Sequence, residues 1–226
     1  MGSNDEMIHF SNWREKWQHH KEKEFQVMLQ EVEQIAQRLI SFREKMRALY
    51  LFQQWTGYQR TKESTADILP EQIFQQWFLY DYLNVKQERM VEFVLKEAKL
   101  HHYWEYASNL IASYYSLYQV QKKGQTVRLI SLLEDKPAWS MEGSGMDGLE
   151  TERTYYALMR PVKVGVKLFP FKPVVFLTKE QAQKMQAWSY EKRKAQTIPM
   201  RIWMKGEGLG MFRFIFEKNH WRVSDG

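Results

Sequence analysis

The chain has 226 residues, of which 44% are hydrophobic and 15% aromatic, so it can form a substantial core and general disorder is excluded. It contains no cysteine, which excludes disulfides, thiolate zinc sites and cysteine nucleophiles. The formal net charge is +6, but residues 1–118 hold 14 Lys and Arg against 16 Asp and Glu, so the basic excess lies in residues 119–226, with 19 against 11.

No apolar run approaches the roughly 18 residues that a membrane-spanning helix needs, and the first six residues are polar and acidic, unlike a signal peptide. We therefore expect a cytoplasmic protein without a membrane partner. A basic excess attracts polyanions such as nucleic acid, although it also serves solubility alone.

The most regular pattern is a heptad repeat in the first quarter of the chain. Apolar residues alternate at spacings of three and four over three and a half heptads. These seam residues are Phe25, Met28, Val32, Ile35, Leu39, Phe42, Met46 and Leu49. The pattern predicts one long helix over residues 21–54, which either pairs with another chain or packs in a bundle within its own. Apolar Leu29, Ala36 and Tyr50 beside the seam favour the bundle.

Further helices are predicted after a polar loop. Pro70 is suited to the first turn of an apolar helix that contains Trp77 and Asp81. Residues 86–99 and 102–118 predict two more helices. Among its aromatic neighbours, Asp81 is expected to accept hydrogen bonds that join two elements. The alternative is an acid or base with a raised pKa.

The apolar spacing changes to two near Tyr118. A turn at Gly124 predicts a β-hairpin, and residues 155–166 and 174–177 predict further strands. Thr178 and Gln181 form a capping box, which predicts a helix to about Ala195. Residues 200–205 and 211–216, with glycines between them, predict a final hairpin.

The predicted fold class is therefore α+β, with two domains. The first, residues 1–118, is an N-terminal helical bundle. The second, residues 119–226, is a basic β-rich domain with a small, strongly bent β-sheet or barrel and one late helix.

The sequence QWFLYDY at residues 76–82, a helix that ends ASYYSLY at residues 112–118, and the strands that follow resemble a group of uncharacterised bacterial proteins. In that group a W-(F/L)-(I/L)-(F/Y)-D-Y helix precedes a second helix, which ends S-Y-x-S-L-Y, and a small β region. Such proteins often carry a C-terminal SEC-C zinc motif, which is absent here because the chain has no cysteine. The resemblance covers residues 70–180. It implies the order of helices and barrel but carries over no active-site residue.

No catalytic, cofactor or metal motif stands out. Glu97, His101 and Glu105 would share one face of a helix, but no second cluster completes a set of metal ligands. The glycines at 206, 208 and 210 lie between predicted strands rather than before a helix, unlike a phosphate-binding loop. We therefore expect neither an enzyme nor a bound cofactor or metal.

The candidate site is the basic surplus of the last third. Residues 160–222 hold 14 Lys and Arg against 4 Asp and Glu. In the predicted strand 200–205, one aromatic and two basic side chains would share a face suited to base stacking and phosphate contact. The candidate nucleic-acid-binding residues are Lys192, Arg193, Lys194, Arg201, Trp203, Lys205, Arg213 and Arg222.

Two functions are therefore expected from the sequence. The first is a non-enzymatic binding module that contacts nucleic acid through its C-terminal part. The alternative is a protein-interaction or scaffold component that docks or self-associates through the heptad seam.

Overall fold

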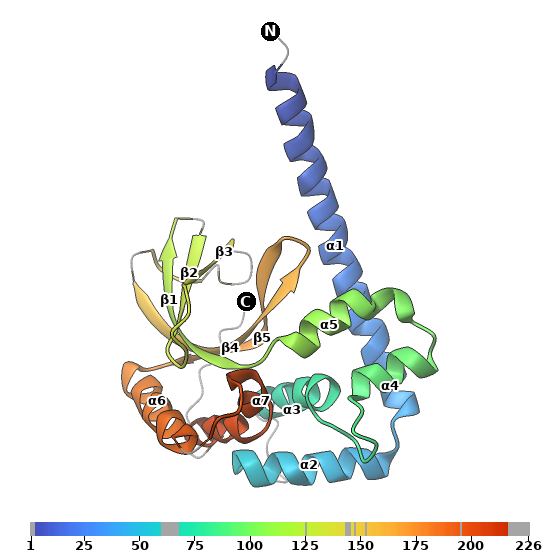
Figure 1. The fold of residues 1–226 in the computed structure, drawn as a ribbon, viewed down its shortest axis with the longest axis vertical. Helices are drawn as coiled ribbons and strands as arrows, with labels where there is room; N and C mark the ends of the chain where they lie inside the picture. Colours follow the sequence, from blue (N-terminus) through green and yellow to red (C-terminus); the bar gives the residue numbers. More distant parts are fainter. Residues whose placement is uncertain are drawn as a thin grey trace.

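The computed structural model describes residues 3–59, 68–124, 126–142, 146, 148–151, 153–194 and 196–216. The fold class is α+β as predicted, and Figure 1 shows a bent sheet with helices packed along it. The helical part before the sheet consists of α1 (Ser3–Leu39), α2 (Phe42–Thr56), α3 (Ile68–Tyr80), α4 (Met90–Glu97), η1 (His101–Tyr103) and α5 (Trp104–Ala112). The strands are β1 (Ser116–Lys123), β2 (Thr126–Ser131), β3 (Trp139–Glu142), β4 (Thr154–Val164) and β5 (Lys167–Leu177). The last elements are α6 (Lys179–Arg193), α7 (Met200–Lys205), η2 (Glu207–Phe212) and α8 (Arg213–Phe216).

The prediction of one helix over residues 21–54 is wrong, because the helix is interrupted between α1 and α2. Ser41 has extended backbone angles, φ −63° and ψ 148°, and its Oγ accepts a hydrogen bond from the Glu44 amide at 3.3 Å. This is an N-cap, which starts a new helix. The heptad seam is therefore divided into two helices of different direction.

The two halves of the seam have different environments. Phe25, Met28 and Val32 are buried, and the Phe25 ring lies 5.9 Å from Tyr106 and 6.3 Å from Phe171 of the same chain. Ile35 and Leu49 are half-buried, whereas Leu39, Phe42 and Met46 are exposed. The first half therefore belongs to the chain's own core, and the second half faces solvent.

The five strands form one antiparallel sheet in the order β3-β2-β1-β4-β5. The predicted hairpin at Gly124 is confirmed, since β1 pairs with β2 around a glycine whose φ of 58° suits a tight turn. Within the described residues β3 and β5 form two open edges, so the sheet bends without closing into a barrel.

Each face of the sheet has its own core. The face inside the bend packs Tyr118, Val120, Leu129 and Met159 against one another. The other face contributes residues such as Leu158 to a single cluster with the buried side chains of the helices. The two predicted domains therefore share one hydrophobic core.

The predicted final hairpin is wrong, and α6 is followed by further helices. Met200, Trp203 and Met204 are buried at helical spacing, which places them on one face of α7. Gly208 and Gly210 permit close packing there: an added Cβ would lie 2.8 Å from Met204 Sδ or 2.7 Å from Trp188 Cη2. The glycines therefore serve tertiary contact rather than a hairpin turn.

Candidate functional site

Asp81 lies at the centre of a buried ionic cluster. Arg160 of β4 donates from Nη1 to Oδ2 at 2.8 Å and from Nη2 to Oδ1 at 3.2 Å, and the Lys205 ammonium of α7 also donates to Oδ1. The Asp81 and Arg160 side chains are 4% and 0% exposed, and that of Lys205 is 10% exposed. The prediction that Asp81 joins two elements is confirmed, and those elements are β4 and α7.

The cluster holds two cations and one carboxylate, and the end of α5 compensates the excess positive charge. Arg160 donates to the backbone carbonyls of Leu110 and Ser113 and to the Ser113 hydroxyl, and Lys205 donates to the Ile111 carbonyl. These carbonyls lie at a helix C-terminus, where intrahelical partners are missing and the helix dipole is negative. The cluster therefore fixes the end of α5 to the sheet.

Burial lowers the pKa of Lys205 to about 8, against the opposing effect of Asp81. An unfolded lysine titrates near 10.4, so between these values the unfolded chain binds more protons than the folded one. We expect the free energy of unfolding to rise from pH 8 to about 9.5, by at most ~2 kcal/mol. Below pH 8 both states are protonated and this dependence vanishes.

Urea titrations at several pH values measure this effect, with Lys205→Met as the comparison. The variant should lose the rise above pH 8. It should keep the fall in the free energy of unfolding that is expected above about pH 10. Tyrosines of the unfolded chain ionise there, whereas burial raises the pKa of Tyr82 in the folded chain to about 12. An unchanged rise in the variant would assign the effect to another group.

The predicted nucleic-acid-binding residues divide into separate groups. Lys192, Lys194 and Arg201 are exposed, and Arg193 is half-buried with its guanidinium 5.9 Å above the Trp203 ring. Trp203 is 1% exposed, so the predicted stacking face on a strand is wrong. Arg222 lies outside the described residues.

The other two basic candidates serve contacts within the chain. Lys205 belongs to the ionic cluster. Arg213 is exposed, but its guanidinium donates to the backbone carbonyls of Gln54 and Trp55 at 2.5 and 2.8 Å, near the end of α2. Its position there matches the preference of cations for helix C-termini.

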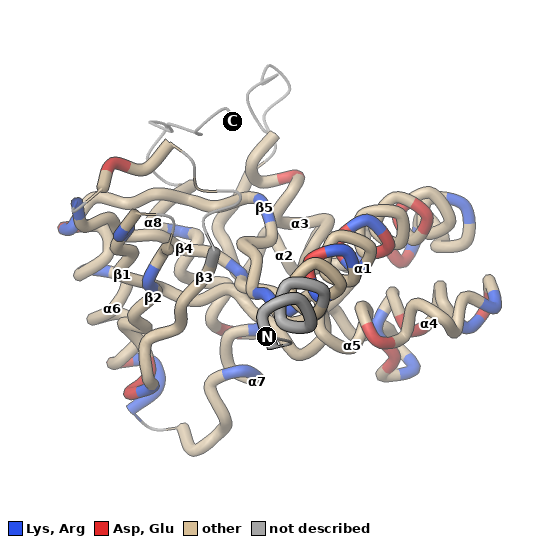
Figure 2. The backbone as a smooth tube through the Cα atoms, turned by 90° about the horizontal axis from the view of Figure 1, so that it is seen from above, with Lys and Arg blue, Asp and Glu red and all other residues tan. Residues whose placement is uncertain are grey.

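Two of the four cations around α6 and α7, Arg193 and Lys194, line a cavity of about 360 Å³ between α6 and the end of β2, which we call the basic cleft. Its lining residues are Leu132, Leu133, Gln186, Ser189, Tyr190, Arg193 and Lys194. Tyr190 is 69% exposed. Figure 2 shows Lys and Arg positions over the sheet and α6 with few acidic ones, whereas both kinds alternate along α1.

The predicted face of Glu97, His101 and Glu105 does not form. Because α4 ends at Glu97 and the chain passes through η1 before α5, these residues lie on three different elements. Among the residues that the structure describes, no group of three or more His, Asp or Glu side chains could hold a metal ion. The described helices also include none that is long and apolar enough to cross a membrane.

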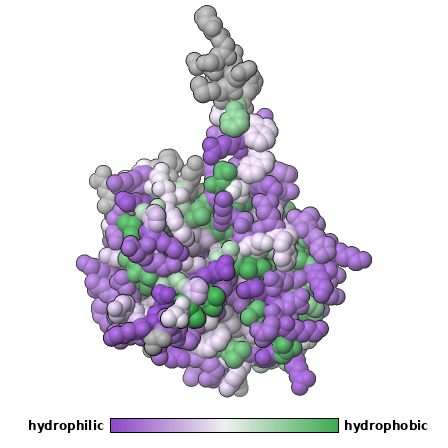
Figure 3. Space-filling model, in the orientation of Figure 1, coloured by the Kyte–Doolittle hydropathy of each residue, from purple (hydrophilic) through white to green (hydrophobic). Residues whose placement is uncertain are grey.

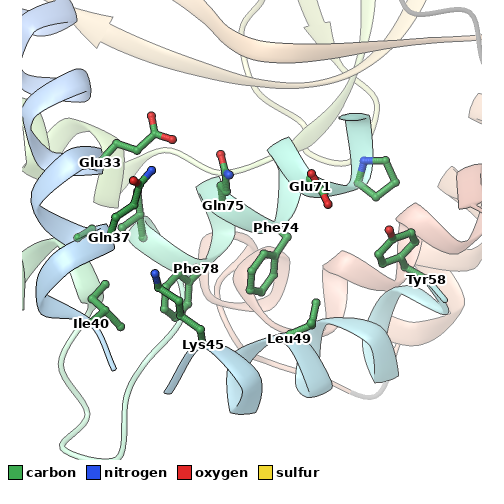
Figure 4. Close-up of a pocket in the computed structure, with 13 residues that line it drawn as sticks. Glu33, Gln37, Ile40, Lys45, Leu49, Tyr58, Glu71, Phe74, Gln75 and Phe78 are labelled. Carbon is green, nitrogen blue, oxygen red and sulfur yellow. The ribbon is translucent and has the colours of Figure 1, made fainter. Parts of the chain in front are cut away.

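A second cavity, which we call the α2–α3 groove, measures about 280 Å³ and lies between the end of α1, α2 and α3 (Figure 4). Its apolar lining consists of Ala36, Ile40, Leu49, Tyr58, Pro70, Phe74, Phe78 and Leu79, and its polar lining consists of Glu33, Gln37, Lys45, Glu71 and Gln75. Figure 4 shows Phe74 and Phe78 extending from α3 toward the α2 side, where Lys45 and Leu49 lie.

An exposed apolar row borders this groove on α2. Phe42, Met46 and Tyr50 are 77%, 46% and 62% exposed and follow one another at spacings of four. Each lies within one turn of Lys45 or Leu49, which line the groove. Two predicted seam residues thus form the rim of the groove and a third, Leu49, forms part of its wall. The sequence analysis did not predict that α3 forms the other wall of the groove, because the periodicity of a helix does not show which helices pack together.

Comparison of the chain with protein-family models, curated proteins and solved structures gives no match.

Proposed function

We propose that the protein is a non-enzymatic interaction module whose docking surface is the α2–α3 groove with its exposed row. The observation that carries this proposal is the exposure of three large apolar side chains beside an apolar groove. Single exposed apolar residues are ordinary, but a row contiguous with a groove is typical of binding sites.

The partner that fits is an amphipathic helix. A groove walled by helices accepts the apolar face of another helix, with anchors at spacings of three, four and seven residues. The polar lining of the groove, which lies along its rim, includes two acidic residues, Glu33 and Glu71, and one cation, Lys45. A partner helix with basic residues beside its apolar face would therefore complement the rim.

The double variant Phe42→Ser, Met46→Ser tests this function. Both side chains are largely exposed, so the change should leave stability within about 1 kcal/mol while removing apolar contact area. We expect the tagged variant to recover the partner at least about tenfold less well than the unmodified chain, by quantitative mass spectrometry.

Val166→Ser is the matched control, because Val166 is 51% exposed in the β4–β5 turn and is not among the residues that line the groove. It should recover the partner as well as the unmodified chain. Equal recovery by all three proteins would reject the groove as the docking surface.

Three exposed cations near the end of α6 and on α7, one of them in the basic cleft, favour nucleic acid as a second candidate function. Lys192, Lys194 and Arg201 supply charge for phosphates, and exposed Tyr190 supplies a ring for base stacking. For single-stranded nucleic acid, the logarithm of the binding constant falls with the logarithm of the salt concentration. The slope is about 0.7 for each phosphate that the protein neutralises.

Replacing those three cations with Gln should weaken binding of a single-stranded oligonucleotide and reduce the salt slope by about 2. The matched control is Lys16→Gln, Lys86→Gln, Lys96→Gln, which removes the same charge from exposed positions elsewhere. Fluorescence anisotropy over a salt series measures both. Equal slopes would assign binding to net charge alone, and no binding at ~50 mM salt would reject the function.

A further inference from the structure

The connection from α6 to α7 combines exposed apolar side chains with cations. Tyr190, Ile198 and Ile202 are 69%, 39% and 55% exposed. Residues 190–205 contain five Lys and Arg and one acidic residue, and one of the five cations, Lys205, belongs to the buried ionic cluster. Figure 2 shows this part of the chain at the lower edge of the molecule, between the labels α6 and α7, where a large partner has access to it. Figure 3 shows green apolar groups interspersed with purple hydrophilic ones over the lower part of the molecule, where these two helices lie.

The packing of α7 directs two of its residues outward. Met200, Trp203 and Met204 are buried on one side of this helix. Arg201 and Ile202 are exposed and therefore lie on the opposite side. The helix thus presents a cation and an aliphatic side chain together to solvent.

The end of α6 continues this surface. Tyr190, Arg193 and Lys194 line the basic cleft together. Arg193 connects the cleft to the start of α7, because its Nη2 donates to the Ile198 carbonyl at 3.5 Å. The Ile202 amide donates to the carbonyl of the residue that follows Ile198, at 3.0 Å, so the two isoleucines lie within about one turn of each other. We call this surface the basic edge, and it consists of Tyr190, Arg193, Lys194, Ile198, Arg201 and Ile202.

We infer that the basic edge binds the surface of an anionic membrane, with Ile198 and Ile202 inserted among the lipid headgroups and the cations placed against the phosphates. Exposed aliphatic side chains gain free energy from burial at the boundary of headgroups and acyl chains. Nucleic acid offers mainly phosphates and base faces, which leave aliphatic side chains without a matching partner. The combination of aliphatic side chains and cations therefore selects a lipid surface.

The charges around the basic edge agree with this partner. Clusters of Lys and Arg beside apolar groups are typical of proteins that bind anionic lipid. Acidic residues of neighbouring segments have partners within the chain: Glu134 accepts from the Lys136 ammonium at 2.7 Å, and Glu207 accepts from the Gln196 amide at 2.9 Å. Glu191 is exposed on α6, and the cations of the basic edge outnumber it. Binding of this kind needs neither a spanning helix nor a signal peptide, on whose absence the expectation of no membrane partner rests.

Co-sedimentation of the full chain with vesicles tests the inference. We expect the chain to bind vesicles of equimolar phosphatidylglycerol and phosphatidylcholine at least about tenfold more tightly than vesicles of phosphatidylcholine alone. Ile198→Ser, Ile202→Ser should weaken binding to the anionic vesicles about tenfold, because two apolar contacts with lipid are lost. The matched control is Val27→Ser, Val166→Ser, at positions 45% and 51% exposed outside the basic edge, and it should leave binding unchanged.

The charge contribution has its own pair of variants. Lys194→Gln, Arg201→Gln should weaken binding to the anionic vesicles about thirtyfold at low salt, because each cation near such a surface contributes about a factor of five. Lys16→Gln, Lys96→Gln removes the same charge from exposed positions elsewhere. It should weaken binding about twofold or less, because salt screens charges that are distant from the lipid.

Two comparisons separate this inference from the proposed functions. The groove variant Phe42→Ser, Met46→Ser should bind the anionic vesicles as well as the unmodified chain. The isoleucine variant should bind a single-stranded oligonucleotide as well as the unmodified chain, because it keeps every cation. An isoleucine variant that loses oligonucleotide binding but keeps vesicle binding would assign the basic edge to nucleic acid and overturn the inference.

A fluorescent label tests the insertion directly, since the chain has no cysteine of its own. A polarity-sensitive dye attached to Ile202→Cys should shift its emission to shorter wavelength when anionic vesicles are added, whereas the same dye on Val27→Cys should not. No binding to the anionic vesicles at ~50 mM salt, where screening is weak, would overturn the inference. Equal vesicle binding by the isoleucine variant and the unmodified chain, or an unshifted dye at position 202, would also overturn it by assigning the contact to charge alone.

Discussion

Replacement of Asp81 by alanine is expected to lower the free energy of unfolding by about 3–5 kcal/mol. The change leaves the Arg160 and Lys205 cations without their counter-ion, although their side chains are 0% and 10% exposed. Backbone carbonyls at the end of α5 would remain as acceptors, but they carry only partial charge. Removing one partner of a buried ion pair is costly because an uncompensated charge stays buried.

Urea unfolding measures this loss, with Asp135→Ala as the control at an exposed position, where about 0.5 kcal/mol or less is expected. Lys205→Met should cost less than Asp81→Ala, because it leaves the bidentate Arg160–Asp81 pair in place. If Asp81→Ala does not fold, the order of Lys205→Met and Arg160→Met still tests the cluster, with the Arg160 variant less stable. A loss below about 1 kcal/mol for Asp81→Ala would contradict the account.

The second large effect compares two methionines of the same predicted seam. Met28→Ala is expected to lower the free energy of unfolding by about 2–5 kcal/mol, whereas Met46→Ala should change it by about 0.5 kcal/mol. The chemical change is identical, but Met28 is fully buried and Met46 is 46% exposed. Urea unfolding of both variants measures the two losses in the free energy of unfolding. Equal losses would show that the seam forms one continuous interface, as a single helix would require.

Local signals in the sequence predicted the elements that depend on neighbouring residues. The capping box at Thr178 is confirmed: its Oγ1 accepts from the Gln181 amide at 3.2 Å, and Gln181 Oε1 accepts from the Thr178 amide at 2.8 Å. The hairpin at Gly124 is likewise confirmed. Such elements could be predicted because the residues that stabilise them lie within a few positions of one another.

The break at Ser41 also had a local signal, which the heptad pattern obscured. Ser41 followed by Glu44 is the Ser-x-x-Glu signature of a helix start. The apolar periodicity continues across the break without a change of phase, so periodicity alone indicates one helix. In the structure Ser41 caps the start of α2, and the heptad seam is divided at that residue.

The final segment and the candidate site depended on contacts between distant residues. Trp203 alternates with Arg201 and Lys205 as in a strand, yet its burial beside Met200 and Met204 requires a helix. Asp81 and Arg160 are 79 residues apart, so nothing near Asp81 in the sequence identifies its partner. The α2–α3 groove is formed by three helices, and their relative placement is not encoded in the period of any one of them.

Photo-crosslinking from position 46 tests the proposed docking function most directly. A photoreactive phenylalanine analogue at Met46 lies on the rim of the α2–α3 groove, and the same analogue at Tyr190 serves as an exposed comparison outside it. We expect position 46 to crosslink a protein segment with apolar residues at helical spacing and basic residues beside them. A segment without that pattern, or the same products from both positions, would contradict the proposal.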